Sequence, residues 1–130
     1  MAENEQQVSE FKSKSGMKRI FSAFFYSIDG FKVAWRGEHA FRQELLLVVP
    51  GVIVALLLHI PPLHKLVLIA VLLLILIVEL INSAIEAVVD RVSFEHHPLS
   101  KNAKDLGSAA VFLSFVLAVA TWGVILAPLL

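Results

Sequence analysis

The sequence predicts an all-α membrane protein in which an N-terminal amphipathic surface helix precedes three transmembrane helices. Two observations support this fold class. Of the 130 residues, 58% are hydrophobic, whereas an average soluble domain has about 45–50%. Three long apolar stretches also follow one another along the chain, and each approaches the roughly 20 helical residues that cross a bilayer. Because three helices enclose little interior, we expect any catalytic site to be assembled between subunits.

Charge and cysteine content exclude several classes of function. Eleven basic and eleven acidic side chains cancel, so net charge gives no reason to expect a nucleic-acid partner. The absence of cysteine excludes a disulfide framework, a thiolate zinc site and a cysteine nucleophile. The first long apolar run starts only near Leu45, which is too late for a signal peptide.

The N-terminal part of the chain changes character near residue 17. Residues 1–16 are polar and rich in Glu, Gln, Ser and Lys, and we expect them to be disordered. Residues 17–36 carry apolar side chains every three or four positions, which predicts an amphipathic helix. The apolar positions include Ile20, Phe24, Ile28, Phe31 and Trp35. Their aromatic character favours a helix in the membrane interface over one packed on protein, with breaks expected at Gly30 and Gly37.

Three transmembrane helices are expected over about residues 41–60, 66–92 and 106–127. With the surface helix they form a single membrane domain, residues 17–130. Pro50-Gly51 allows a bend within the first span. Pro61-Pro62 cannot continue a helix and predicts a hairpin between the first two spans. The polar segment 93–105 is expected to be a loop.

Lysine and arginine are unevenly distributed between the two membrane faces. Ten of the eleven precede the first span or lie in the second loop, and the first loop carries only Lys65. The positive-inside rule therefore places the N-terminus and the second loop in the cytoplasm, and the C-terminus on the opposite side. Most acidic side chains lie on that same cytoplasmic face.

A polar stripe closes the second span. The run from Leu66 to Val78 contains no polar side chain. Since each helical residue turns by about 100°, Glu79, Glu86 and Asp90 then fall within about 40° of one another. Asn82 and Ser83 flank them. A single polar residue would be enough to fix helix association. A whole stripe of them in an apolar helix therefore favours a functional site.

The residues at the cytoplasmic face suit a magnesium–nucleotide complex. Mg²⁺ prefers hard oxygen ligands and takes only one or two carboxylates, and Glu38 and Glu86 are expected at similar depth. Lys104 could neutralise phosphate, while Asp105 or Glu95 could accept a hydrogen bond from a ribose or a base. The alternative for Glu38 is a solvated acid at the interface, and Lys104-Asp105 could instead be the charged N-terminus of a helix.

Glu79 lies about 10 Å deeper than Glu86 along the helix. At that depth it could take a proton from the hydroxyl of a lipid, which suggests phosphoryl transfer from an aqueous nucleotide to a membrane alcohol. The soluble nucleotide-binding and kinase motifs are absent from the sequence. These residues alone leave two functions open, phosphoryl transfer and ion transport.

Three segments resemble the prokaryotic diacylglycerol kinase family. They are residues 34–44, with Ala-Phe-Arg-Gln-Glu at the end, 79–90, with Glu-Leu-Ile-Asn-Ser-Ala-Ile-Glu, and 99–111, with Ala-Lys-Asp-Leu-Gly-Ser-Ala-Ala-Val. With Arg19 and Tyr26-Ser27, the resemblance extends over about residues 17–122. It implies a homotrimer of the bacterial inner membrane with composite inter-subunit sites. The family's activity is the Mg²⁺- and ATP-dependent conversion of diacylglycerol to phosphatidic acid.

The resemblance also implies roles for individual residues. Glu79 corresponds to the catalytic base, and Glu38 and Glu86 to the magnesium ligands. The ATP-binding positions are Arg19, Tyr26, Glu38, Glu86, Glu95, His96, His97, Lys104 and Asp105, supported by Asn82 and Asp90. The lipid-side positions are Arg19, Phe24, Ser27, Gln43, Glu44, Glu79, Ser108 and Trp122. Asp29 and the bulky Phe24 depart from the family pattern, and bear on lipid entry more than on chemistry.

Two alternatives of different kinds remain. The first is a related kinase of undecaprenol, although the segment 41–44 and Trp122 resemble the diacylglycerol branch more closely. The second is a non-enzymatic proton or cation pathway. Such a pathway needs polar groups through the full bilayer thickness, whereas the outer half of every span is apolar.

Overall fold

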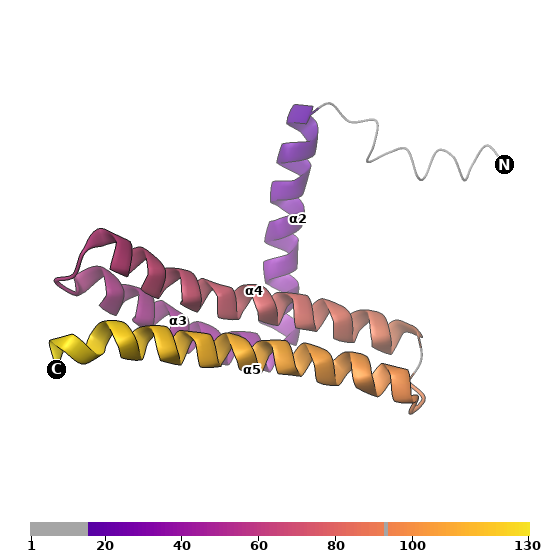
Figure 1. Ribbon diagram of the computed structural model, residues 1–130. Helices are drawn as coiled ribbons and strands as arrows, with labels where there is room; N and C mark the ends of the chain where they lie inside the picture. Colours follow the sequence, from indigo (N-terminus) through magenta and orange to yellow (C-terminus); the bar gives the residue numbers. More distant parts are fainter. Residues whose placement is uncertain (1–15, 93) are drawn as a thin grey trace. The chain divides into compact units, whose positions relative to one another are not determined.

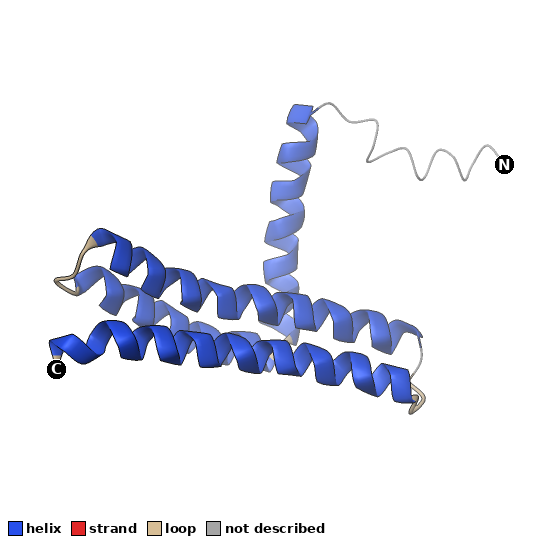
Figure 2. Cartoon of the chain, viewed as in Figure 1, coloured by secondary structure: helices blue, strands red, loops and turns tan. Residues whose placement is uncertain are grey.

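The computed structural model describes residues 16–92 and 94–130, so the segment expected to be disordered lies outside it except for Gly16. The described residues form helices and no strand (Figures 1 and 2). The α-helices are α2 (Gly16–Gly37), α3 (His39–Leu57), α4 (Pro62–Val92) and α5 (Pro98–Leu126), and the short 3-10 helix η1 (Ala127–Leu129) follows. The chain divides into two units, α2 and a three-helix unit that spans Glu38–Leu130.

The first unit contains α2, a continuous helix of 22 residues. The expected break at Gly30 is wrong, because the helix passes through Gly30 and ends at Gly37. A single glycine inside a helix costs only about 1 kcal/mol relative to alanine, which a helix of this length tolerates. Large aromatic side chains of α2, among them Phe21, Phe24 and Phe31, are exposed. Its place in the membrane interface stays a prediction.

In the second unit, α4 is the central helix and contacts both α3 and α5 (Figure 1). The buried apolar core consists of Val48, Val71, Leu72, Ile75 and Ala118. Trp122 packs against this core, and its Nε1 donates a hydrogen bond to the Leu68 carbonyl oxygen at 3.2 Å. The indole therefore ties α5 to α4 within the apolar part of the unit.

All three helices of this unit are long and apolar enough to cross a membrane. This confirms the predicted all-helical architecture with three membrane-length helices. Large apolar side chains such as Leu46, Ile77 and Val119 face outward. The most apolar stretch of α5 is only 11% buried, against 33% for α4, so most of the α5 surface requires a cover of lipid or protein.

The start of α5 differs from the sequence expectation. We expected a loop up to Asp105, but the helix begins at Pro98. His97 precedes the helix, and its Nδ1 accepts a hydrogen bond from the Leu99 backbone N–H at 3.1 Å. Pro98 takes an early helical position, where its missing N–H has no helical partner to lose. Polarity alone had suggested a loop, but the cap makes the segment helical and places its charged side chains on one helix.

Candidate active site

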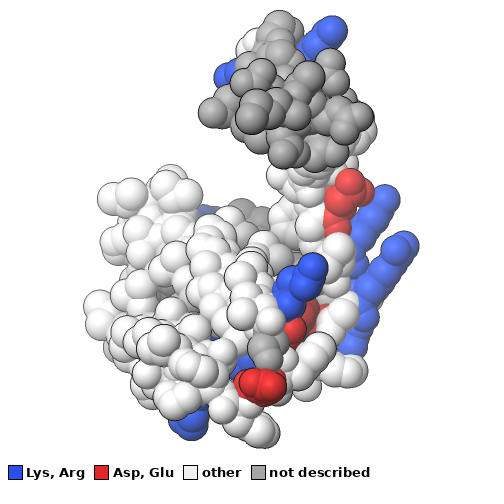
Figure 3. Space-filling model, turned by 90° about the vertical axis from the view of Figure 1, so that its right-hand side faces the viewer, with Lys and Arg blue, Asp and Glu red and all other residues white. Residues whose placement is uncertain are grey.

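The polar stripe of α4 runs from a buried region to an accessible one. Glu79 is 5% exposed and Asn82 is 8% exposed, whereas Glu86 and Asp90 are half-buried. Figure 3 looks onto the end of the unit where α4 meets α5, and charged side chains of both signs are visible there. One helix face therefore connects the interior of the unit with a charged end.

A pair of carboxyl groups lies at the buried end of the stripe. Glu44, from α3, is 7% exposed, and its side chain is close enough to that of Glu79 to interact with it directly. Glu79 also lies within electrostatic reach of Glu86 and Glu38. Burying carboxyl groups together in a membrane-length helix bundle is costly, and such groups usually mark a site.

Several polar atoms around this pair have no hydrogen-bond partner among the described residues. They are Glu44 Oε2, Asn82 Oδ1 and Ser83 Oγ, and all of them are buried. A buried polar atom left unpaired costs about 1–3 kcal/mol. Such atoms can pair with polar groups of water, of a ligand or of another chain.

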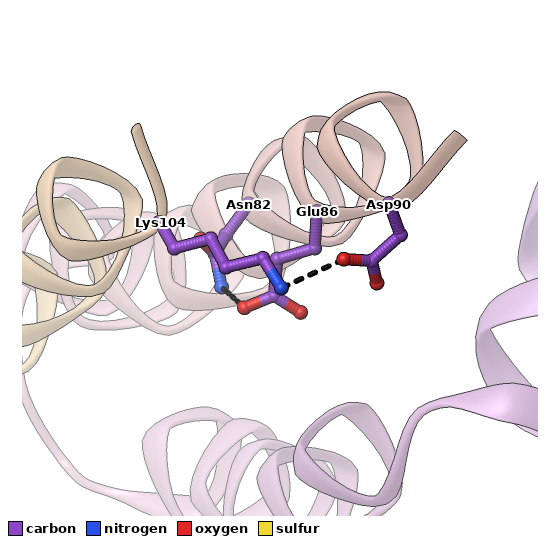
Figure 4. Close-up of polar contacts among 4 residues, drawn as sticks. All are labelled: Asn82, Glu86, Asp90 and Lys104. Carbon is purple, nitrogen blue, oxygen red and sulfur yellow. Dashed lines mark hydrogen bonds and ion pairs between the residues drawn. The ribbon is translucent and has the colours of Figure 1, made fainter. Parts of the chain in front are cut away.

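The accessible end of the stripe is organised by two polar contacts (Figure 4). Asn82 Nδ2 donates to Glu86 Oε1 at 3.4 Å, and Lys104 Nζ, from α5, donates to Asp90 Oδ1 at 2.7 Å. Figure 4 shows the Lys104 ammonium group reaching over the Glu86 carboxylate toward Asp90. The lysine thus balances negative charge from both acids.

Beside these contacts, the connection between α4 and α5 borders an open pocket of about 660 Å³. Its volume is within the range of about 300–1,000 Å³ that is typical of small-molecule sites. The ionisable residues lining it are Asp90, Glu95, His96, His97, Lys101, Lys104 and Asp105. Its lysines can donate to phosphate, and its acids can accept from hydroxyl or amino groups, which are the groups that a nucleotide carries.

Comparison with known proteins identifies the family. The prokaryotic diacylglycerol kinase model matches residues 25–126. The chain belongs to the prokaryotic diacylglycerol kinase family. It is similar to the diacylglycerol kinase of Pseudomonas aeruginosa, with 57% identity covering 91% of this chain and 96% of the relative. The diacylglycerol kinase of Escherichia coli K12 is 46% identical, over 86% of this chain and 92% of the relative. These matches confirm the resemblance.

The structure brings together many of the positions that the family resemblance singled out. Glu95, His96, His97, Lys104 and Asp105 line one cavity, and Asp90 joins them. Glu44 and Glu79 meet in the buried pair. The candidate site therefore has two parts, which we call the nucleotide pocket, after the ligand proposed for it below, and the buried carboxyl pair.

Other positions lie elsewhere or in the separate helical unit. The side chains of Gln43 and Ser108 are exposed, and Trp122 packs on the apolar core. The remaining candidates lie on α2, which belongs to the other unit. These are Arg19, Phe24, Tyr26 and Ser27.

Two residues that sequence reasoning missed belong to the site. Lys101 lines the nucleotide pocket, and its Nζ pairs with Asp105 Oδ2 at 2.5 Å. The four-residue spacing was a usable signal, because such pairs face each other on a helix, but the segment was expected to be a loop. Gly107 is buried directly against Asn82, a contact that no spacing within one helix reveals.

The two residues expected to bind magnesium, Glu38 and Glu86, both lie within electrostatic reach of Glu79, but neither lines the pocket between α4 and α5. Within residues 16–92 and 94–130, no group of three or more acids and histidines could hold a metal ion by itself. Mg²⁺ bound with a nucleotide needs only one or two carboxylates, because phosphate and water complete its shell. Glu38 precedes α3 and makes no side-chain capping bond, and Glu86 receives the Asn82 amide.

We expect the Asp90–Lys104 pair to contribute little to stability. Its side chains are 44% and 43% exposed, and water screens such pairs effectively. The test is a double-mutant cycle of Asp90→Asn and Lys104→Gln, with thermal unfolding measured in detergent micelles. The shift in unfolding midpoint of the double variant should equal the sum of the two single-variant shifts. The control cycle, Asp105→Asn with Lys101→Gln, alters a pair that is 61% and 76% exposed and should also be additive. Strong coupling in the first cycle alone would show that this pair stabilises the fold.

Proposed function

We propose that this protein is an ATP-dependent diacylglycerol kinase. It transfers the γ-phosphoryl group of Mg-ATP to the hydroxyl of diacylglycerol, and the products are phosphatidic acid and ADP. The observation that carries the proposal is that one face of α4 joins the buried carboxyl pair to the nucleotide pocket. A lipid substrate and an aqueous substrate require these two environments side by side. The two relatives named above are diacylglycerol kinases, and their names support the same activity.

The buried carboxyl pair is the proposed lipid side. The diacylglycerol hydroxyl approaches from the bilayer and donates a hydrogen bond to Glu79. As the hydroxyl oxygen forms its bond to the γ-phosphorus, the bond from that phosphorus to the β–γ bridging oxygen breaks, and Glu79 accepts the hydroxyl proton. Glu44 Oε2 and Ser83 Oγ, which lack partners among the described residues, are available to polar atoms of the glycerol group.

The nucleotide pocket is the proposed ATP side. Glu38 and Glu86 would hold Mg²⁺, which when bound offsets the phosphate charge during transfer. Lys104 lies within reach of Asp90, of Glu86 and of the pocket, and donates to phosphate oxygens. Asp105 and Glu95 accept hydrogen bonds from the nucleoside, and His96 and His97 complete the wall. Arg19 and Tyr26 of α2 are assigned to this side through the family resemblance.

The proposed assembly is a homotrimer in the bacterial inner membrane, with the N-terminus in the cytoplasm. Two features support an assembly with composite sites: the small buried fraction of α5 and the unpartnered polar atoms near Glu79. The lysine and arginine distribution supports the orientation. The exposed aromatic side chains of α2 support its placement in the membrane interface.

A lipid-phosphorylation assay tests the activity directly. Purified protein in mixed micelles, supplied with γ-radiolabelled ATP and Mg²⁺, is expected to convert diacylglycerol to labelled phosphatidic acid. Undecaprenol in a parallel reaction is expected to be a poor acceptor. Preferential labelling of undecaprenol would assign the protein to the polyprenol branch. Failure to label either lipid would leave the proton or cation pathway, measured as flux in vesicles, as the competing function.

Replacing Glu79 by glutamine tests its role as the base. Since general bases contribute about 10²–10⁴-fold to rate, Glu79→Gln should lower kcat by that factor and leave ATP binding near the wild-type value. Ser114→Ala is the matched control, because Ser114 is 4% exposed and its hydroxyl donates to the Val111 carbonyl within its own helix. Full activity of Glu79→Gln would refute the assignment.

Replacing Glu86 by glutamine tests the metal site. An uncharged amide is a weaker Mg²⁺ ligand than a carboxylate, so Glu86→Gln should abolish activity over a wide range of magnesium concentrations. Asp29→Asn, which alters an exposed acid of α2, should respond to magnesium as the wild type does. Wild-type activity of Glu86→Gln at ordinary magnesium concentration would rule out the ligand role.

A further inference from the structure

Gly107 of α5 makes an unusually close contact with the polar stripe of α4. It is buried, and a Cβ atom added to it would lie 2.1 Å from Asn82 Oδ1 and 3.2 Å from Asn82 Cγ. The first distance is far shorter than any van der Waals contact. The Asn82 amide therefore occupies the space in which the side chain of any other residue at position 107 would begin.

The other half of the same amide contacts Glu86. Asn82 Nδ2 donates to Glu86 Oε1 at 3.4 Å, while Oδ1 faces Gly107 and has no hydrogen-bond partner among the described residues. An ionised carboxylate can only accept hydrogen bonds, so the amide must present its NH₂ group to Glu86. With 8% of Asn82 exposed, there is little free space into which the amide could turn.

We propose that Gly107 is a positioning residue for the magnesium-binding carboxylate. By leaving room for the Asn82 amide, it maintains the hydrogen bond through which Asn82 orients Glu86. A methyl group at position 107 would displace the amide, and Glu86 would lose that donor. This inference rests on the proposed function, since Glu86 is a metal ligand only there. Loss of a group that orients a metal ligand typically weakens metal affinity by about 10–100-fold.

A purely structural role is the competing explanation, since small residues also allow helices to approach each other. Two other glycines of the chain serve as controls that distinguish this structural role from positioning of the Asn82 amide. A Cβ on Gly51 of α3 would lie 2.7 Å from Leu72 Cδ1, which is crowding against an apolar side chain. A Cβ on Gly123 of α5 would meet nothing within 4 Å. Gly51→Ala thus controls for helix crowding and Gly123→Ala for helix propensity.

The experiment compares Gly107→Ala, Gly51→Ala and Gly123→Ala in the full-length protein. The main readout is the apparent Mg²⁺ dissociation constant, from magnesium-dependent binding of a non-hydrolysable ATP analogue without lipid, and the unfolding midpoint is measured alongside. Gly107→Ala should weaken apparent Mg²⁺ affinity about 10–100-fold, while both controls keep the wild-type value. A wild-type constant for Gly107→Ala, or an equal loss in Gly51→Ala, would overturn the proposal.

A double variant keeps the test decisive if Gly107→Ala is unstable. Asn82→Ala removes the amide that the new methyl group would meet, so Asn82→Ala/Gly107→Ala is expected to fold. It should bind Mg²⁺ as weakly as Asn82→Ala alone, because no amide remains to be displaced. A further loss of affinity in the double variant would show that Gly107 acts independently of Asn82. If the wild type neither phosphorylates diacylglycerol nor binds the analogue with magnesium, the proposed function itself fails.

Discussion

The cost of placing carboxyl groups in an otherwise apolar helix is the constraint on which the rest of the structure depends. A buried polar group is stable only when other groups compensate for its lost water. α4 carries Glu79 and Asn82 in its buried part. The neighbouring helices α3 and α5 supply the groups that surround the stripe. α3 contributes Glu44 beside Glu79, and α5 contributes Gly107 beside Asn82 and Lys104 beside Asp90. The packing of the unit is thus arranged around one polar stripe.

The same stripe explains how two substrates of opposite character could meet. Along a single helix, the side chains pass from the buried Glu79 to the half-exposed Asp90, so the environment changes while the backbone stays regular. The nucleotide pocket lies where the helix face becomes accessible, between α4 and the first turns of α5. A rigid helix fixes the positions of the residues on the two sides, while transfer itself requires the lipid hydroxyl and the γ-phosphorus to approach within about 3–3.5 Å.

Much of this arrangement could be predicted from the sequence because it depends on local patterns. Apolar runs specify the three long helices, and the 3.6-residue repeat places Glu79, Glu86 and Asp90 on one face. Contacts between helices were harder to foresee, because the sequence pattern does not give the register of one helix against another. The Asn82–Gly107 contact belongs to this class. The early start of α5 was missed because a polar segment resembles a loop until its cap is recognised.

The exposed apolar surface of α5 and the unpaired polar atoms near Glu79 must be covered by different kinds of groups. Lipid tails can cover the outer face of α5, which is largely apolar, but they cannot satisfy Glu44 Oε2 or Ser83 Oγ. Only polar atoms can do so, and within the proposed function they come from the glycerol group of the substrate or from a neighbouring subunit. Since burial makes such unpaired atoms costly, a substrate or subunit that pairs with them gains affinity at the depth of Glu79. The polar stripe would then contribute to the selection of the substrate as well as to the reaction.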